Sequence, residues 1–170
     1  MQEYLIVDGY NIIFAWPEFE KFKESSLDHA RSKLVAILAN YSPLSGQKVV
    51  VVFDAYQQKN ITGKAEFIDG VEVVYTQHGE TADTLIERLA GDLSKDGLVY
   101  VATSDWAEQG IIFGRGAYRI TPGELRMQVN HVKQENEELW SESKPVDSYL
   151  ENRLLEKVRL KLEKWRREKG

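Results

Sequence analysis

The stretch Leu5-Ile6-Val7-Asp8 decides the fold, because the chain repeats its pattern twice. Val49-Val50-Val51-Val52-Phe53-Asp54 and Val99-Tyr100-Val101-Ala102-Thr103-Ser104-Asp105 are also apolar runs that end at an aspartate. Apolar runs of this length, separated by helical patterns, indicate buried parallel strands. Sites in open α/β sheets form outside the carboxyl ends of the strands. The pattern therefore predicts an α/β domain with acidic side chains gathered at one edge of its sheet.

Helical patterns separate most of the expected strands. We expect strands at Tyr4–Val7, Lys48–Phe53, Val71–Tyr75, Leu98–Ala102 and Ala117–Ile120. We expect helices at Leu27–Tyr41, Thr81–Leu93, Trp106–Phe113, Thr121–Trp140 and Val146–Lys169. The segment Ser42–Gly46 is expected to break the first helix, and Tyr56–Gly70 to form a mobile loop. Right-handed crossovers between these strands give a mostly parallel sheet.

Three of these helices have a recognisable first turn. Ser26 and Thr81 are suited to cap the backbone N–H groups of the helices that follow them. The string Thr121-Pro122-Gly123-Glu124 combines a capping threonine, a proline at the first helical position and a glutamate at the third. The sequence therefore predicts a sharply defined helix start at Thr121.

The composition excludes several classes of protein. The 170 residues suit a single α/β domain, and with 42% hydrophobic residues the chain can bury a sizeable core. The chain contains no cysteine, which rules out disulfides and thiolate zinc sites. No apolar run approaches a membrane span, and the N-terminus does not have the pattern of a signal peptide. These features favour a cytoplasmic protein.

The charge of the chain is unevenly distributed. The formal net charge is −5, yet residues 151–170 carry eight basic and four acidic side chains, a net +4, which leaves −9 for the remainder. A basic segment on an acidic body is suited to bind a polyanion. The alternative is a solvated helix face with ordinary glutamate–lysine pairing.

Four aspartates are candidates for one site. Asp8, Asp54 and Asp105 follow the three apolar runs, and Asp83 lies in the first turn of an expected helix, preceded by Glu80. Oxygen ligands without cysteine or paired histidine favour Mg²⁺ or Mn²⁺. Each aspartate singly is also explained by capping or by the helix macrodipole. The gathering of several acidic groups is the stronger signal, because it is costly without a cation.

Further polar residues near these positions are candidates for substrate binding. Asn11 follows Asp8 closely and is suited to orient it or to contact a phosphate. The Thr103 and Ser104 hydroxyls are placed to hold a water or the scissile phosphate, although Ser104 or Asp105 alternatively caps a helix. Four basic residues are candidates to steer a polyanion past an acidic body, namely Lys59, Lys64, Arg115 and Arg119.

The motifs together resemble the YacP-like NYN-domain ribonucleases, within the PIN-like nuclease group. The resemblance rests on LIVDGYN at Leu5–Asn11, VVVFD at Val50–Asp54, ETAD at Glu80–Asp83, ATSD at Ala102–Asp105, FGRGAYR at Phe113–Arg119 and KWRR at Lys164–Arg167. Each string is short, but their order and spacing are specific and cover nearly the whole chain. The residues that match the acidic positions of the family are Asp8, Asp83 and Asp105, with Asp54 and Glu80 as further candidates.

The resemblance implies a fold and an activity. The fold is a PIN-like three-layer α/β/α sandwich with a mostly parallel sheet and C-terminal helical additions. Residues 1–145 would form the NYN/PIN-like nuclease domain, and residues 146–170 a basic helix packed on it. The activity is a cytoplasmic, Mg²⁺- or Mn²⁺-dependent endoribonuclease that cleaves mRNA in association with ribosomes. In it, Asp8, Asp83 and Asp105 would be the catalytic metal ligands, and Asn11, Ser104 and the four basic residues would bind substrate.

Two other functions fit parts of the sequence. A non-catalytic RNA- or ribosome-binding module on the same fold would use the basic segment. It would gain nothing from clustered carboxylates, because these repel the RNA backbone. A phosphoacceptor signalling domain also places aspartates at strand ends, but it requires paired acids after the first strand, where Gly9 follows Asp8. The sequence therefore favours the nuclease.

Overall fold

The computed structural model describes residues 1–22, 26–55, 64–105, 116–142 and 161–168. The chain divides into two compact units, Met1–Val129 and Asn130–Gly170. The expected helix Trp106–Phe113 and the expected domain boundary after residue 145 lie outside the described residues. In the described part, no helix has the length and apolar character needed to cross a membrane.

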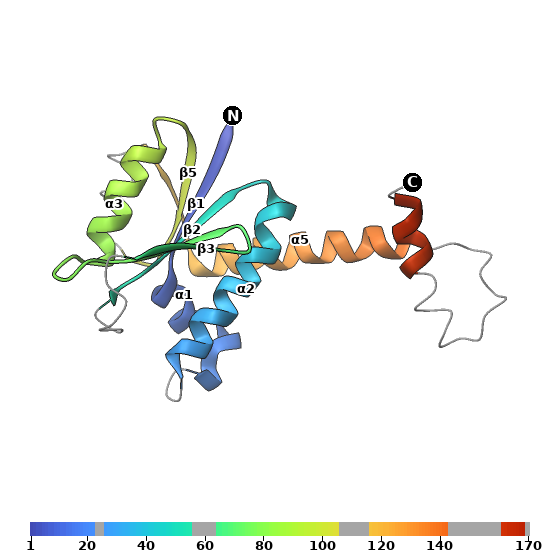
Figure 1. Ribbon diagram of the computed structural model, residues 1–170, viewed down its shortest axis with the longest axis horizontal. Coiled ribbons are helices and arrows are strands. Elements are labelled where there is room, and N and C mark those ends of the chain that lie inside the picture. Colours follow the sequence, from blue (N-terminus) through green and yellow to red (C-terminus); the bar gives the residue numbers. More distant parts are fainter. Residues whose placement is uncertain (23–25, 56–63, 106–115, 143–160, 169–170) are drawn as a thin grey trace. The chain divides into compact units, whose positions relative to one another are not determined.

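A six-stranded sheet forms the centre of the first unit (Figure 1), with strand order β3-β4-β2-β1-β5-β6. Neighbouring strands run parallel except for β3 and β4, which form an antiparallel hairpin. The strands are β1 (Gln2–Asp8), β2 (Lys48–Phe53), β3 (Ala65–Ile68), β4 (Val71–Tyr75), β5 (Gly97–Ala102) and β6 (Tyr118–Ile120). The predicted α/β class and mostly parallel sheet are confirmed.

The three helices for which the sequence predicts a capping residue begin where that residue lies. They are α1 (Gly9–Ala15), the 3₁₀ helix η1 (Pro17–Phe22), α2 (Leu27–Ser45), α3 (Ala82–Leu93) and α5 (Pro122–Glu142). The Ser26 side chain accepts a hydrogen bond from the backbone N–H of His29, and Thr81 accepts one from Thr84. At the start of α5, Thr121 and Glu124 form the reciprocal capping box, with N···O distances of 3.0 and 3.2 Å.

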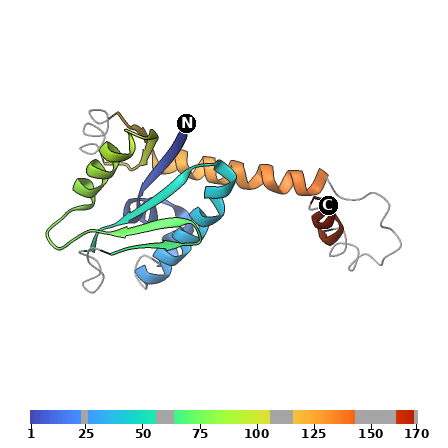
Figure 2. The ribbon, with the colours of Figure 1, turned by 45° about the horizontal axis from the view of Figure 1, so that its top comes forward.

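Helices cover both faces of the sheet (Figure 2). On one face, Leu85 and Ile86 of α3 are buried in a cluster that includes Ile6, Val52 and Val101. The side chains of a strand alternate between faces, so the neighbouring strand residues point to the opposite side, where α1 and α2 pack against β2. This arrangement is the predicted three-layer α/β/α sandwich.

Two segments differ from the prediction. Helix α2 does not break at Ser42 but continues through Pro43 to Ser45, because its end is set by Gly46, which adopts a left-handed φ of 78°. The expected loop Tyr56–Gly70 contains strand β3, whose residues are all exposed. An edge strand without a buried face shows no alternation of apolar and polar residues, so the sequence did not indicate it.

Two further elements were missed. The segment directly after Asp8 forms α1, and the segment from Pro17 forms η1. Both are short, so neither repeats an apolar spacing often enough to stand out in the sequence.

The second unit contains the last residues of α5 and a helical segment at 161–168. Lys164 is buried, and its Nζ lies 3.8 Å from the centroid of the Trp140 ring, a cation–π contact. Trp165 and Leu162 are about half exposed. The expected helix Val146–Lys169 is therefore confirmed over 161–168, where the structure describes it.

Candidate active site

The carboxyl ends of β1 and β5 bring Asp8 next to Thr103. These strands are parallel neighbours with Val7 opposite Ala102, so Asp8 and Thr103 leave the sheet side by side. The buried Thr103 hydroxyl donates to Asp8 Oδ2 at 3.4 Å. The Thr103 Oγ1 atom also accepts a hydrogen bond of 3.1 Å from the backbone N–H of Asp105. One threonine therefore links the two aspartates that end neighbouring strands.

The electrostatics of Asp8 show that Asp83 also lies near this edge. Burial is the largest cause that raises the pKa of Asp8 from 3.8 to about 6, followed by the negative charge of Asp83 and then that of Asp105. The Asn11 backbone N–H and the Thr103 hydroxyl act in the opposite direction. The sheet edge thus gathers three of the predicted carboxylates. Capping of α1 does not account for Asp8, since its side chain makes no capping hydrogen bond there.

Asn11 and Ser104 hold each other across the site. The Asn11 side-chain amide donates to Ser104 Oγ at 2.9 Å, and Asn11 Oδ1 accepts from the Ser104 backbone N–H at 2.9 Å. A third contact of 3.1 Å joins the Ser104 hydroxyl to Asn11 Oδ1. These bonds tie the first turn of α1 to the segment that carries Thr103 and Asp105. Both side chains, predicted to bind substrate, therefore also set the geometry of the carboxylates.

Gly9 allows the chain to turn tightly behind Asp8. A Cβ atom at this position would lie 2.3 Å from Cε1 of the Phe53 ring, which is closer than side chains tolerate. Phe53 is fully buried at the end of β2 and packs edge-on against Tyr10, with ring centroids 5.2 Å apart. The glycine thus lets α1 start directly against the sheet.

Sequence reasoning missed a buried polar pair beneath the site. The Tyr10 hydroxyl accepts a hydrogen bond of 2.9 Å from Arg31, whose guanidinium is buried and also pairs with Asp28. Burial raises the pKa of Tyr10, and the charge of Asp54 adds to that effect. Arg31 lies on the buried face of α2, where the sequence pattern alone suggests an exposed charge. Arg31 is buried because it bonds to Tyr10, which is distant in the sequence, so the residues next to Arg31 do not indicate its burial.

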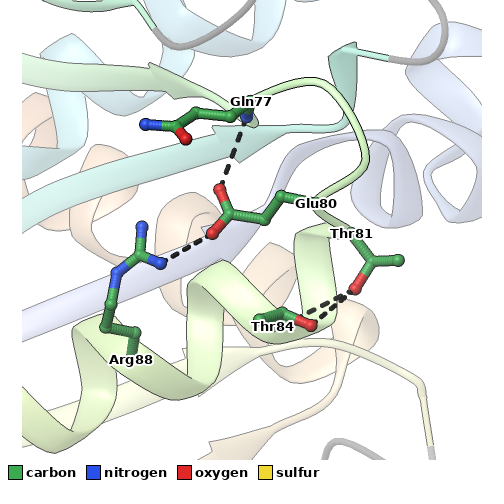
Figure 3. Close-up of polar contacts among 5 residues, drawn as sticks. All are labelled: Gln77, Glu80, Thr81, Thr84 and Arg88. Atoms are coloured by element: carbon green, nitrogen blue, oxygen red, sulfur yellow. Dashed lines mark hydrogen bonds and ion pairs between the residues drawn. The ribbon is translucent and has the colours of Figure 1, made fainter.

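The other two acidic candidates occupy different surroundings. Glu80 Oε2 accepts a hydrogen bond of 2.6 Å from Arg88 (Figure 3), and Glu80 Oε1 accepts one of 3.4 Å from the Gln77 backbone N–H. Asp54 follows β2, and its negative charge contributes to the raised pKa of Tyr10. Neither is among the charges that shift the pKa of Asp8.

The basic candidates are only partly described. Lys64 is exposed directly before β3, and its carbonyl accepts the backbone N–H of Tyr75 at 2.8 Å. Arg119 lies on β6 opposite Val101, one residue before the end of that strand. Lys59 and Arg115 lie outside the described residues. The structure therefore places Arg119 close to the carboxyl end of the sheet and Lys64 at the start of the hairpin.

The donor set is chemically suited to a hard cation. Oxygen atoms of aspartate, asparagine and threonine surround this edge, and Mg²⁺ commonly combines one or two carboxylates with several waters. Within the described ranges, no group of three or more histidine, aspartate or glutamate side chains is arranged so that it could hold a metal ion by itself. The residues present thus fit an open, water-rich cation site in which the protein supplies few direct ligands.

Comparison with known proteins identifies the family. The YacP-like NYN domain matches residues 5–167. The chain belongs to the YacP-like NYN family. It is 40% identical over 168 residues to the YacP protein of Bacillus subtilis (strain 168), covering 96% of both chains.

Solved structures agree with this assignment. A crystal structure of Rae1 (YacP) from Bacillus subtilis matches with a TM-score of 0.70 at 40% identity, covering 96% of this chain and 94% of that one. A tryptophan-to-leucine mutant of Rae1 matches with a TM-score of 0.70 at 38% identity, over 85% of this chain and 86% of that one. The resemblance predicted from the motifs is confirmed, and the NYN family supports a nuclease role with RNA as the substrate class.

Proposed function

We propose that this NYN-family chain is a divalent-metal-dependent endoribonuclease that cleaves RNA phosphodiesters, with mRNA on the ribosome as its substrate. The observation that carries the proposal is the position of Asp8. Burial, followed by the nearby negative charges of Asp83 and Asp105, raises the pKa of its carboxyl group. A protein gains no stability from such an arrangement, so a cationic ligand is the simplest reason for it.

The described residues would divide the work of the site among them. Asp8, Asp83 and Asp105 would hold Mg²⁺ or Mn²⁺ partly through bound waters. The bound ion would supply an acidified water and offset charge on the phosphate. Thr103 keeps Asp8 and Asp105 aligned through its hydroxyl. Asn11 and Ser104 hold together the segments that follow the two strands. They would also offer polar atoms to an incoming phosphate. Arg119, Lys64, Lys59 and Arg115 would attract the RNA backbone.

Asp8 also has a role that depends on pH. With a pKa of about 6, its carboxyl group is largely ionised at neutral pH and becomes protonated below that value. A protonated carboxyl group is a poor cation ligand. Because protons compete with the cation for this carboxylate, the apparent affinity of the protein for Mn²⁺ is expected to fall as the pH drops below about 6.

The direct test is cleavage of RNA by the purified protein. Naked RNA and translating ribosomes are each incubated with wild type and with Asp83→Asn, in Mn²⁺ or in EDTA, and circular dichroism checks the fold of the variant. We expect cleavage by wild type in Mn²⁺, loss in EDTA, and loss of most activity in the folded variant. Cleavage restricted to translating ribosomes supports the ribosome part of the proposal. RNA binding without cleavage in any condition would instead identify a binding module.

A further inference from the structure

The turn between β4 and α3 carries Asp83 into the site and is fixed at both ends. At its start, the buried Thr76 donates its backbone N–H to the Phe53 carbonyl at 3.1 Å, and its hydroxyl accepts the Ala55 N–H at 2.8 Å. At its end, Thr81 caps α3 through the Thr84 N–H at 3.2 Å. Asp83 lies two residues beyond that cap, so the path of the turn decides where its carboxylate lies.

Glu80 joins the turn to the body of α3. Figure 3 shows its carboxylate between the Gln77 backbone and the Arg88 side chain, with Thr81 and Thr84 closing the first turn of the helix. The Glu80 backbone N–H also donates to the Gln77 carbonyl at 3.0 Å. One side chain thus closes the turn onto itself and fastens it to a residue two helical turns along α3.

The solvent exposure of the Glu80–Arg88 ion pair indicates its role. The Arg88 side chain is 54% exposed and that of Glu80 is 15% exposed. Ion pairs with such access to solvent contribute little to global stability. The Glu80 carboxylate is neutralised by a guanidinium and oriented by a backbone N–H. These features suit a group that fixes local geometry, whereas a cation ligand would need its charge available.

We infer that Glu80 is a positioning residue, which acts through Arg88 and the Gln77 backbone to fix the turn that presents Asp83 to Asp8. The inference rests on the proposed function for its catalytic consequence. It assigns Glu80 a different role from the metal-binding one that its acidic motif suggests. Misplacing a reacting group by about 1 Å costs up to ~100-fold in rate, so a loosened turn is expected to lower turnover while leaving RNA affinity largely unchanged.

The test compares Glu80→Gln, Arg88→Met and the double variant. Asp92→Asn is the matched control, because Asp92 forms an exposed ion pair of 3.9 Å with Lys95 near the other end of α3. RNA cleavage in Mn²⁺ gives kcat and KM for each protein. A positioning role predicts that both single variants lose roughly 10- to 100-fold in kcat, that KM changes little, and that the double variant is no worse than either single one. Arg88→Lys should recover part of the loss, since lysine keeps the charge.

Two kinetic results would overturn the inference. If Glu80→Gln loses activity while Arg88→Met keeps wild-type kcat, Glu80 acts in the site directly. If both variants match the Asp92→Asn control, the turn does not need the pair. Should wild type neither cleave RNA nor bind Mn²⁺, the proposed function fails, and amide hydrogen exchange of the metal-free proteins decides the positioning claim. Faster exchange at Asp83–Leu85 in both variants supports it, and unchanged exchange rejects it.

Discussion

Thr103 and Asp8 meet across the ends of neighbouring parallel strands, with the threonine Oγ1 3.4 Å from the aspartate Oδ2. The same hydroxyl accepts the Asp105 N–H. The contact matters because it stabilises the charge of a carboxylate whose burial and two acidic neighbours disfavour that charge. The protonation state of Asp8 therefore affects both the stability of the fold and the charge of the candidate site.

The first prediction concerns the pH dependence of stability. Asp8 has a higher pKa in the folded protein, about 6, than its ordinary value of 3.8. The folded state therefore binds more protons between these values, and the contribution of Asp8 to the free energy of unfolding falls as the pH rises from about 4 to 6. The full change is about 3 kcal/mol by the standard conversion.

Urea unfolding in EDTA at pH 4, 5, 6 and 7 measures this change. The comparison is between wild type and Asp8→Asn, because groups far from Asp8 titrate alike in both proteins. The stability of wild type relative to the variant should fall across the window and level off above pH 6. A constant difference between the two proteins would show that Asp8 has an ordinary pKa.

The second prediction concerns the turn after Asp8. Gly9→Ala places a methyl group where the Phe53 ring lies, with Cβ 2.3 Å from Cε1. Overpacking of this kind costs ~1–3 kcal/mol, and the shift of α1 should also lower RNA cleavage. Gly123→Ala is the control, since the nearest atom to its added Cβ is 3.9 Å away. Equal melting temperatures for the two variants would contradict the close approach of Gly9 to the sheet.

The third prediction concerns the basic C-terminal segment. Lys161, Arg166 and Arg167 are exposed, whereas Lys164 is buried against Trp140. Changing the three exposed residues to Gln should weaken RNA binding and reduce the slope of log affinity against log salt by about 2. A triple Gln variant of Lys21, Lys48 and Lys95 controls for net charge. If both triple variants give the same slope, the segment is a solvated helix face.

The sheet and its polar edge follow from the sequence because apolar runs that end in aspartate are a local pattern. Asp8 and Asp105 could be placed at one edge because each follows an expected parallel strand. The capping residues Ser26 and Thr81 correctly indicated where their helices begin. These features depend on neighbours along the chain, where sequence patterns are most informative.

The remaining features depend on contacts between distant segments. The buried Arg31 is explained by the Tyr10 hydroxyl, 21 positions away in the sequence, and the hydrogen bonds between Asn11 and Ser104 span 93 positions. Strand β3 has no buried face, so it carries no alternation to detect. The Glu80–Arg88 ion pair was missed for another reason. The sequence places Glu80 near other acidic residues, which suggests a metal ligand, and only the structure shows that Glu80 pairs with Arg88.

The central claim is that Asp8, Asp83 and Asp105 form one cation site, and thermal melts test it most directly. Wild type and Asp8→Asn are melted at pH 7 in EDTA and in Mn²⁺. In EDTA the variant should melt at the higher temperature, because it lacks the desolvated and repelled charge. In Mn²⁺ wild type should gain stability by mass action and the variant much less. Equal responses of the two proteins to Mn²⁺ would contradict the claim that the three aspartates bind a metal together.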